Sequence, residues 1–409
     1  MKPINTLNQP PLVTTKPAPP PFQLSLEQIR QIKNIYAETP LSTPNLSDNI
    51  RDIDTLRYYD SDEYLRFIAS SGFLEYRRVD HDDQIDGSLF GRRTEKRIPG
   101  DPFRLTIDYL DIFHKGKKDP IRYFDSVTVI GDSLSDSEGR MYKKSGNLLT
   151  RANQYYNGRF TNGTTWAEFL TMPSAMQSNQ YSTGESEDPS VKFTNKAEGG
   201  SPSANYLRAT ANPQFFALSN IEKQVSHLKF DNKDLAIVFL GANDYMTYSQ
   251  TDVDYVISSQ EKAIQKMIAD GSRNIIVMGL PDLSLTPAAK RRTKKYQQKM
   301  AALSHEHNIK LKQVAAKMNL QQSCKIQYFD VNQVFEKIMG IANTINAEKP
   351  GSYNTDEAFS DGYIRRDNKP LEIDPHYLFI DDVHPTQEVH MIIATELHQF
   401  ISDKFNPLA

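Results

Sequence analysis

Ser133, Asp381 and His384 are the residue types that nucleophilic catalysis by a hydroxyl group requires. A serine hydroxyl is a weak nucleophile at neutral pH, so it needs a histidine base and a carboxylate that orients this base. Because Asp381 and His384 lie three residues apart, one turn lets the carboxylate reach Nδ1 and leaves Nε2 facing the serine. We therefore expect Ser133 as nucleophile, His384 as general base and Asp381 as the orienting carboxylate.

The segments around these residues predict an α/β fold. Ser133 follows a run of β-branched residues that ends at Gly131, and such a break places a side chain in the crevice at the carboxyl end of a strand. Strands are expected at 126–131, 235–240, 274–280 and 325–329, with helices at about 255–270, 288–319 and 386–405. This alternation predicts a mainly parallel sheet between two helical layers.

Two further segments, 171–192 and 340–375, are rich in Ser, Asn, Gly, Pro and charged residues. Long irregular insertions in such a fold are typical of lids or substrate loops, and we expect that role for both. Trp166 and Phe169 are three apart on an expected helix and are interpreted as core residues.

The composition is that of a globular protein, and it argues against several classes. The chain has 409 residues, 38% of them hydrophobic, and a formal net charge of -3, whereas general nucleic-acid binders carry a basic excess. Its one cysteine, Cys324, allows no internal disulfide, which fits a reducing compartment and is also compatible with a cysteine-poor secreted protein. No long apolar segment marks a cleaved signal peptide or a membrane helix. We expect peripheral membrane contact and, if the protein is exported, a route without a Sec-type signal.

The N-terminal part differs from the rest of the chain. Residues 1–22 hold seven of the 23 prolines and are interpreted as a disordered leader. Helical patterns followed by strand-like alternation indicate a small α+β region at 23–118. The larger α/β domain is expected to occupy residues 119–409.

Four blocks carry the chemical residues in a fixed order: GDSL at 131–134, NKAEGGS at 195–201, GANDY at 241–245 and DDVHP at 381–385. The sequence resembles the SGNH/GDSL hydrolases in all four. Two further stretches, GRFTNG at 158–163 and VMGLPDLSLTP at 277–287, are similar to those of the glycerophospholipid:cholesterol acyltransferase branch. The resemblance covers about residues 122–403 and implies a flavodoxin-like three-layer α/β/α sandwich.

The resemblance also orders the candidates within the site. It implies an oxyanion hole formed by the backbone N–H of Ser133, a loop glycine and the side-chain amide of Asn243, with Gly200 preferred over Gly199. Asp382 is a rival to Asp381 but has the wrong offset for the family pattern. Four other polar residues are interpreted as structural hydrogen-bonding groups: Asp132, Ser135, Asp136 and Asp244.

The resemblance implies a serine-dependent lipid esterase or acyltransferase that needs no metal or organic cofactor. An acyl-enzyme on Ser133, formed from a glycerophospholipid, would pass its acyl group to water or to cholesterol. The resemblance further implies a bacterial effector that is secreted into a host cell by a type III-like route. It would act on host membranes with a GTP-bound Rho-family GTPase as activator.

Four alternatives stay open from the sequence. The same blocks serve carbohydrate and small-ester deacetylases, and the hydrolase domain could instead be a scaffold in a GTPase-binding effector. Residues 23–118 either contribute to a GTPase surface or support folding or secretion. The basic run at 290–295 is either a solvated helix face or a contact for anionic lipid head groups.

Overall fold

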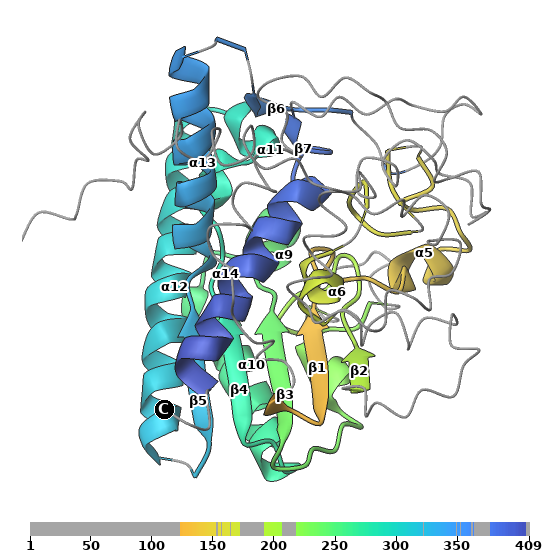
Figure 1. The fold of residues 1–409 in the computed structure, drawn as a ribbon, viewed down its shortest axis with the longest axis vertical. Helices are drawn as coiled ribbons and strands as arrows, with labels where there is room; N and C mark the ends of the chain where they lie inside the picture. The colour runs from red at the N-terminus through yellow and green to blue at the C-terminus, as the bar shows by residue number, and fades with distance from the viewer. Residues whose placement is uncertain are drawn as a thin grey trace, which may run out of the picture.

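A five-stranded parallel sheet forms the centre of the described part of the molecule (Figure 1). Its strands are β1 (Ser126–Gly131), β2 (Lys192–Asn195), β3 (Asp234–Phe239), β4 (Asn274–Met278) and β5 (Lys325–Phe329). They lie in the order β2-β1-β3-β4-β5, and every neighbouring pair is parallel. This is the strand order of a flavodoxin-like sheet, so the expected fold is confirmed.

The computed structural model describes residues 123–171, 192–206, 218–360, 363 and 377–405, apart from the single residues 153, 157, 164, 322, 349 and 352. The expected leader at 1–22 and the α+β region at 23–118 lie outside the described residues. The domain boundary at 118 and 119 therefore stays a prediction.

Helices cover both faces of the sheet. One layer contains α6 (Trp166–Thr171), α13 (Val331–Glu348) and α14 (Gln387–Phe405), and Figure 1 shows α14 crossing in front of the strands. The other layer contains α8 (Ile221–Val225), α10 (Val253–Ala269) and α12 (Lys294–Gln321), which pack together. The remaining elements are α5 (Arg140–Lys144), α9 (Ala242–Met246), η5 (Leu283–Leu285), α11 (Pro287–Lys290), β6 (Asn354–Ala358) and β7 (Tyr377–Phe379).

Burial explains why these segments take these conformations. All six residues of β3 are buried, because a central parallel strand is covered on both faces. Helix α10 instead buries residues at three- and four-residue spacing and begins where Asp252 accepts a hydrogen bond from the Tyr255 N–H. Trp166 and Phe169 are fully buried, so their interpretation as core residues is confirmed.

The structure corrects two expectations. Residues 340–375 were expected to be irregular, but α13 continues to Glu348 and β6 forms at Asn354–Ala358. The predicted helix at 288–319 is two helices, because α11 ends at Lys290 and α12 starts only at Lys294. Of the other expected insertion, 171–192, only the two end residues are described, in α6 and β2.

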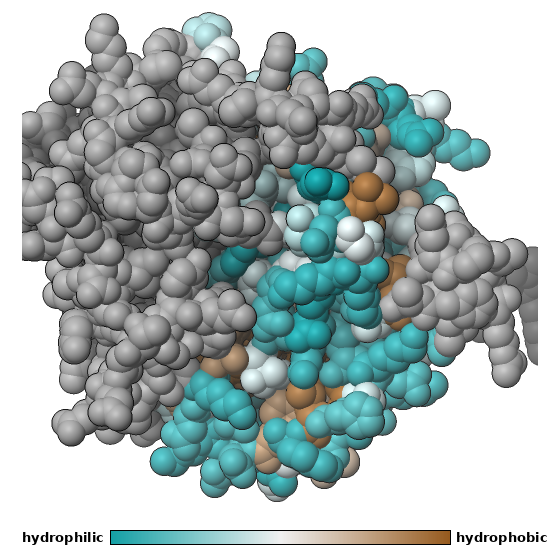
Figure 2. Space-filling model, turned by 90° about the vertical axis from the view of Figure 1, so that its right-hand side faces the viewer, coloured by the Kyte–Doolittle hydropathy of each residue, from teal (hydrophilic) through white to brown (hydrophobic). Residues whose placement is uncertain are grey.

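No helix in the described ranges has a segment long and apolar enough to cross a membrane. On the side of the molecule that faces the viewer in Figure 2, the described surface is mainly hydrophilic and carries small, separate hydrophobic patches.

Candidate active site

The structure brings Ser133, His384 and Asp381 into one hydrogen-bonded line at the carboxyl end of the sheet. His384 Nε2 lies 2.7 Å from Ser133 Oγ, and His384 Nδ1 lies 2.7 Å from Asp381 Oδ2. Ser133 follows β1, whereas the other two residues lie in the loop between β7 and α14. With the ring proton on Nδ1 and bonded to the carboxylate, Nε2 can accept the serine proton.

Asp381 is held by four donors. Its Oδ1 accepts the backbone N–H groups of Val383 and His384, both at 2.8 Å, while Oδ2 accepts the imidazole Nδ1–H. The hydroxyl of Tyr155 also donates to Oδ2, at 2.7 Å. Asp382, the rival orienting residue, instead forms an ion pair with Arg291 and does not bond the imidazole.

Tyr155 is a site residue that the sequence did not reveal. It lies 226 residues before Asp381 in a loop without a recognisable spacing to the triad, so no sequence signal connects the two. Burial of the phenol, reinforced by the neighbouring Asp381 carboxylate, raises the pKa of Tyr155 far above its usual value. The hydroxyl therefore keeps its proton and acts as a fixed donor to the carboxylate.

The stretch GRFTNG at 158–163 supports the loop that carries His384. The ring of Phe160 packs against the imidazole with 4.9 Å between ring centroids. Thr161 Oγ1 donates to the Pro385 carbonyl, and Asn162 Oδ1 accepts the N–H of Gln387 at the start of α14, both at 2.9 Å. This stretch therefore fixes the position of the candidate base from both sides.

The amide of Asn243 is oriented by two neighbours. Its Oδ1 accepts the Thr247 hydroxyl at 3.0 Å, and its Nδ2 donates to the Ser201 carbonyl at 3.2 Å. These contacts identify the oxygen and nitrogen ends of the amide and use one of its two N–H bonds. The second N–H is available to a ligand oxygen, as an oxyanion donor requires.

The two loop glycines differ in what their N–H groups do. Gly199 N–H donates to Asp136 Oδ2 at 2.9 Å, so it already has a partner inside the protein. No group in the described part of the chain accepts a hydrogen bond from Gly200, which has a φ of 79° and is partly exposed. This contrast favours Gly200 over Gly199 as the oxyanion donor.

Buried carboxylates hold the loops around the site. Asp136 accepts three backbone N–H groups, including those of Arg140 and Met141 in α5, and burial raises its pKa to about 6. Asp244 accepts the N–H groups of Ser203 and Ala204, which hold the glycine loop against α9. Both act structurally, as the sequence interpretation expected.

Asp132 lies next to the candidate nucleophile and is also buried. Burial raises its pKa to about 7, although the Leu134 N–H, which it accepts at 3.1 Å, and the nearby His384 oppose this shift. It contacts neither His384 Nδ1 nor Ser133 Oγ, the two positions at which the candidate triad is bonded.

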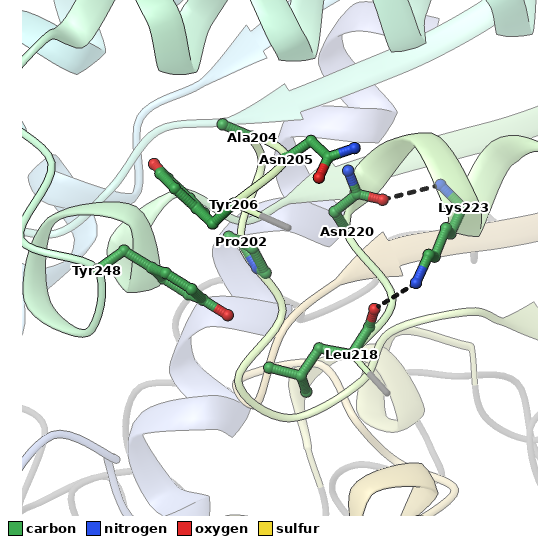
Figure 3. Close-up of a pocket in the computed structure, with 8 residues that line it drawn as sticks. All are labelled: Pro202, Ala204, Asn205, Tyr206, Leu218, Asn220, Lys223 and Tyr248. Carbon is green, nitrogen blue, oxygen red and sulfur yellow. Dashed lines mark hydrogen bonds between the residues drawn. The ribbon is translucent and has the colours of Figure 1, made fainter. Parts of the chain in front are cut away.

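A small pocket adjoins the oxyanion residues (Figure 3). The stacked rings of Tyr206 and Tyr248, with centroids 4.3 Å apart, form one wall, and Leu218 lies on another side. The Tyr248 N–H donates to the Asn243 carbonyl at 3.0 Å, which connects the aromatic wall to the oxyanion amide. The pocket therefore offers mostly apolar surface, to which Asn205, Asn220 and Lys223 add polar groups.

Comparisons with known proteins show which family the chain resembles. Residues 127–397 match the family model described as GDSL-like Lipase/Acylhydrolase. The chain is 38% identical to the "Secreted effector protein SseJ" of Salmonella typhimurium, over 84% of this chain and 81% of that protein. It is 28% identical to the "Phosphatidylcholine-sterol acyltransferase" of Aeromonas hydrophila, over 70% of this chain and 92% of that protein. A "Thermolabile hemolysin" of Vibrio parahaemolyticus is 25% identical, over 67% of this chain and 63% of that protein.

Proposed function

The chain belongs to the family of GDSL-like lipases and acylhydrolases, and from this premise we propose that it transfers acyl groups from glycerophospholipids through an acyl-enzyme on Ser133. The observation that carries the proposal is the position of His384, within 2.7 Å of both Ser133 Oγ and Asp381 Oδ2. The similarity to a phosphatidylcholine-sterol acyltransferase supports the choice of a lipid donor.

In the first half-reaction, Ser133 Oγ attacks the ester carbonyl carbon while His384 Nε2 takes the hydroxyl proton. Asp381 stabilises the imidazolium that forms. The carbonyl oxygen becomes an oxyanion that accepts hydrogen bonds from the N–H groups of Ser133 and Gly200 and from the Asn243 amide. When the ester C–O bond breaks, the imidazolium gives its proton to the departing lysophospholipid oxygen.

In the second half-reaction, a new hydroxyl group attacks the acyl-enzyme. His384 takes the proton of the incoming hydroxyl and returns it to Ser133 Oγ as the acyl–serine bond breaks. Water as acceptor gives a free fatty acid, and cholesterol as acceptor gives a cholesteryl ester. We propose that both acceptors are used.

We also propose a cellular setting for this reaction. The similarity to a secreted effector supports release into a host cell by a type III-like route and action on host membranes. A GTP-bound Rho-family GTPase is proposed as the activating partner. Residues 23–118, together with adjoining loops, are the candidate surface for this partner.

One experiment tests donor, acceptor and activator together. The full-length protein is incubated with vesicles of radiolabelled phosphatidylcholine and cholesterol, with and without a GTP-loaded Rho protein. We expect labelled fatty acid and cholesteryl ester, and a higher rate with the GTPase. The variants Ser133→Ala, His384→Ala and Asp381→Asn should remain folded and lose nearly all product.

Other results, obtained with other substrates or by a binding measurement, would redirect the proposal. Release of acetate from small esters or acetylated sugars, without release of long-chain fatty acid, would indicate a deacetylase. Full binding of a GTPase by a protein without lipid turnover would indicate a scaffold. Substantial turnover by a folded Ser133→Ala protein would remove the assignment of the nucleophile.

A further inference from the structure

The basic run at 290–295 lies against the loop that carries the candidate catalytic residues. It spans the end of α11 and the start of α12. The Ala288 N–H donates to the Asp382 carbonyl at 2.9 Å, and the Arg291 guanidinium pairs with the Asp382 carboxylate. Asp382 is the neighbour of Asp381 in sequence, so the basic run directly contacts the loop that carries Asp381 and His384.

Several cations in this region have no acidic partner. Arg292, Lys294 and Lys295 are exposed, and no carboxylate in the described ranges forms an ion pair with them. Farther along α12 the situation differs, because Lys310 pairs with Asp254 and Lys317 pairs with Glu261. These two lysines face carboxylates of α10, whereas the three cations at the start of α12 have no such acidic neighbour among the described residues.

We define the basic corner as the six cations at the end of α11 and the start of α12: Lys290, Arg291, Arg292, Lys294, Lys295 and Lys299. Among the described residues, the acidic side chains beside it are Asp356, which pairs with Lys290, the nearby Glu357 on β6, and Asp382. Counted over these described residues, six positive charges and three negative ones give +3, in a chain whose formal net charge is -3. The described part of this corner is therefore more positive than the chain as a whole.

The basic corner lies at the same end of the sheet as the candidate nucleophile. Figure 1 shows α11 beside β6 and β7 at the end of the molecule to which the strand arrows point. Ser133 directly follows β1 at the same carboxyl end. A flat anionic surface that approaches this end meets the unpaired cations and the catalytic loop together.

We infer that the basic corner is a docking surface for an anionic lipid bilayer and that it places the Ser133 site at the membrane that holds its substrate. This inference rests on the proposed lipid activity. Each Lys or Arg near an anionic surface strengthens binding by about fivefold, so reversal of three of them should weaken binding by at least about a hundredfold. The attraction acts within a Debye length and should decrease as salt increases.

The test compares two triple variants with the same change in net charge. The first carries Arg292→Glu, Lys294→Glu and Lys295→Glu. The matched control carries substitutions of exposed lysines at or beside the amino ends of three strands, at the opposite end of the sheet: Lys192→Glu, Lys233→Glu and Lys325→Glu. Both are made in the full-length protein, with Ser133→Ala added for the binding measurements so that the vesicles stay intact.

Co-sedimentation is measured with phosphatidylcholine vesicles that contain or lack phosphatidylserine. We expect the parent and the control to prefer the anionic vesicles, and the basic-corner variant to lose this preference. With Ser133 present, the parent, the control and the basic-corner variant should hydrolyse a soluble monomeric ester at the same rate. Phosphatidylcholine in anionic vesicles should be hydrolysed more slowly by the basic-corner variant alone. Equal vesicle binding by both triple variants would overturn the inference. Absence of lipid turnover in the parent would refute the proposed function but would not alter the binding result.

Discussion

Substitution of Asn243 by alanine gives a sharp test of the proposed oxyanion hole. One amide N–H is donated to the Ser201 carbonyl, and the second is available to the substrate oxygen. The substitution therefore removes one oxyanion donor and two internal hydrogen bonds, the one to the Ser201 carbonyl and the one from the Thr247 hydroxyl. Loss of an oxyanion donor costs about 10²- to 10³-fold in turnover, or about 2.7–4 kcal/mol, because the donor acts mainly on charge that develops in the transition state.

The internal bonds contribute separately. A neutral hydrogen bond is worth about 0.5–1.5 kcal/mol, so the Asn243→Ala protein, which lacks two of them, should lose about 1–3 kcal/mol of unfolding free energy and remain folded. Its kcat should fall by about 10²- to 10³-fold with little change in KM. Initial rates on a soluble ester, together with urea unfolding, measure the two effects independently.

Thr247→Val provides the matched control. Its hydroxyl donates to Asn243 Oδ1 at 3.0 Å, so its loss frees the amide to rotate but leaves the oxyanion donor in place. We expect a smaller fall in kcat than for Asn243→Ala, and no further fall when the two changes are combined, because the threonine acts only through the amide. A folded Asn243→Ala protein whose defect lay only in KM would refute the role.

Three other changes follow from the same geometry. In Tyr155→Phe, the orienting carboxylate loses a charge-assisted hydrogen bond worth about 1.5–3 kcal/mol, so the imidazole should be held less firmly and kcat on a soluble ester should fall while the protein stays folded. In Gly241→Ala, a β-carbon at φ 136° would lie 2.7 Å from the His307 ring, so thermal denaturation should show a loss of about 1–3 kcal/mol in unfolding free energy. The value of kcat should also fall, because α9, which carries Asn243, would shift. Burial raises the pKa of Glu396 to about 7, although Lys337 lies 3.0 Å away. Because this folded value is above the unfolded one, the free energy of unfolding falls as pH rises from the unfolded pKa to the folded pKa. Glu396→Gln should therefore gain in melting temperature over the parent between pH 5 and 7 but not below pH 4.

The central sheet could be predicted because its strands differ clearly from their surroundings. Both ends of β1 and of β5 match the expected ranges, and β3 begins and ends one residue earlier than expected, since buried parallel strands are continuous apolar runs. β2 was missed because it has only four residues at the sheet edge and lies beside a segment rich in polar residues. Its pairing with β1 depends on tertiary contacts that a four-residue pattern does not encode.

Helix α13 was missed for a different reason. Val331, Val334, Phe335, Ile338 and Ile341 are buried at helical spacing, so the signal was present in the sequence. The polar composition of 340–375 led to the interpretation of an irregular insertion, and the helix extends into that segment. Periodicity was the better guide, because it reports which face is buried.

In the candidate site too, contacts between residues close in sequence could be predicted, whereas contacts between residues far apart in sequence could not. The three-residue spacing of Asp381 and His384 predicted their hydrogen bond, because both atoms belong to one turn. The choice between Gly199 and Gly200 rested on a resemblance, and the structure adds a physical reason in the bond from the Gly199 N–H to Asp136. Tyr155 is brought to the site only by the folding of a distant loop.

Three contacts hold the loop that carries His384. One of them connects this loop to the proposed membrane surface. Phe160 packs on the imidazole, Tyr155 bonds the orienting carboxylate, and Arg291 at the basic corner pairs with Asp382. The first two contacts set the geometry of the base. The third connects that geometry to a cation at the proposed membrane surface, so lipid phosphates that compete for Arg291 would act on the loop itself. Asp382, the rejected candidate for orienting the base, thus lies between the proposed docking surface and the loop that carries His384.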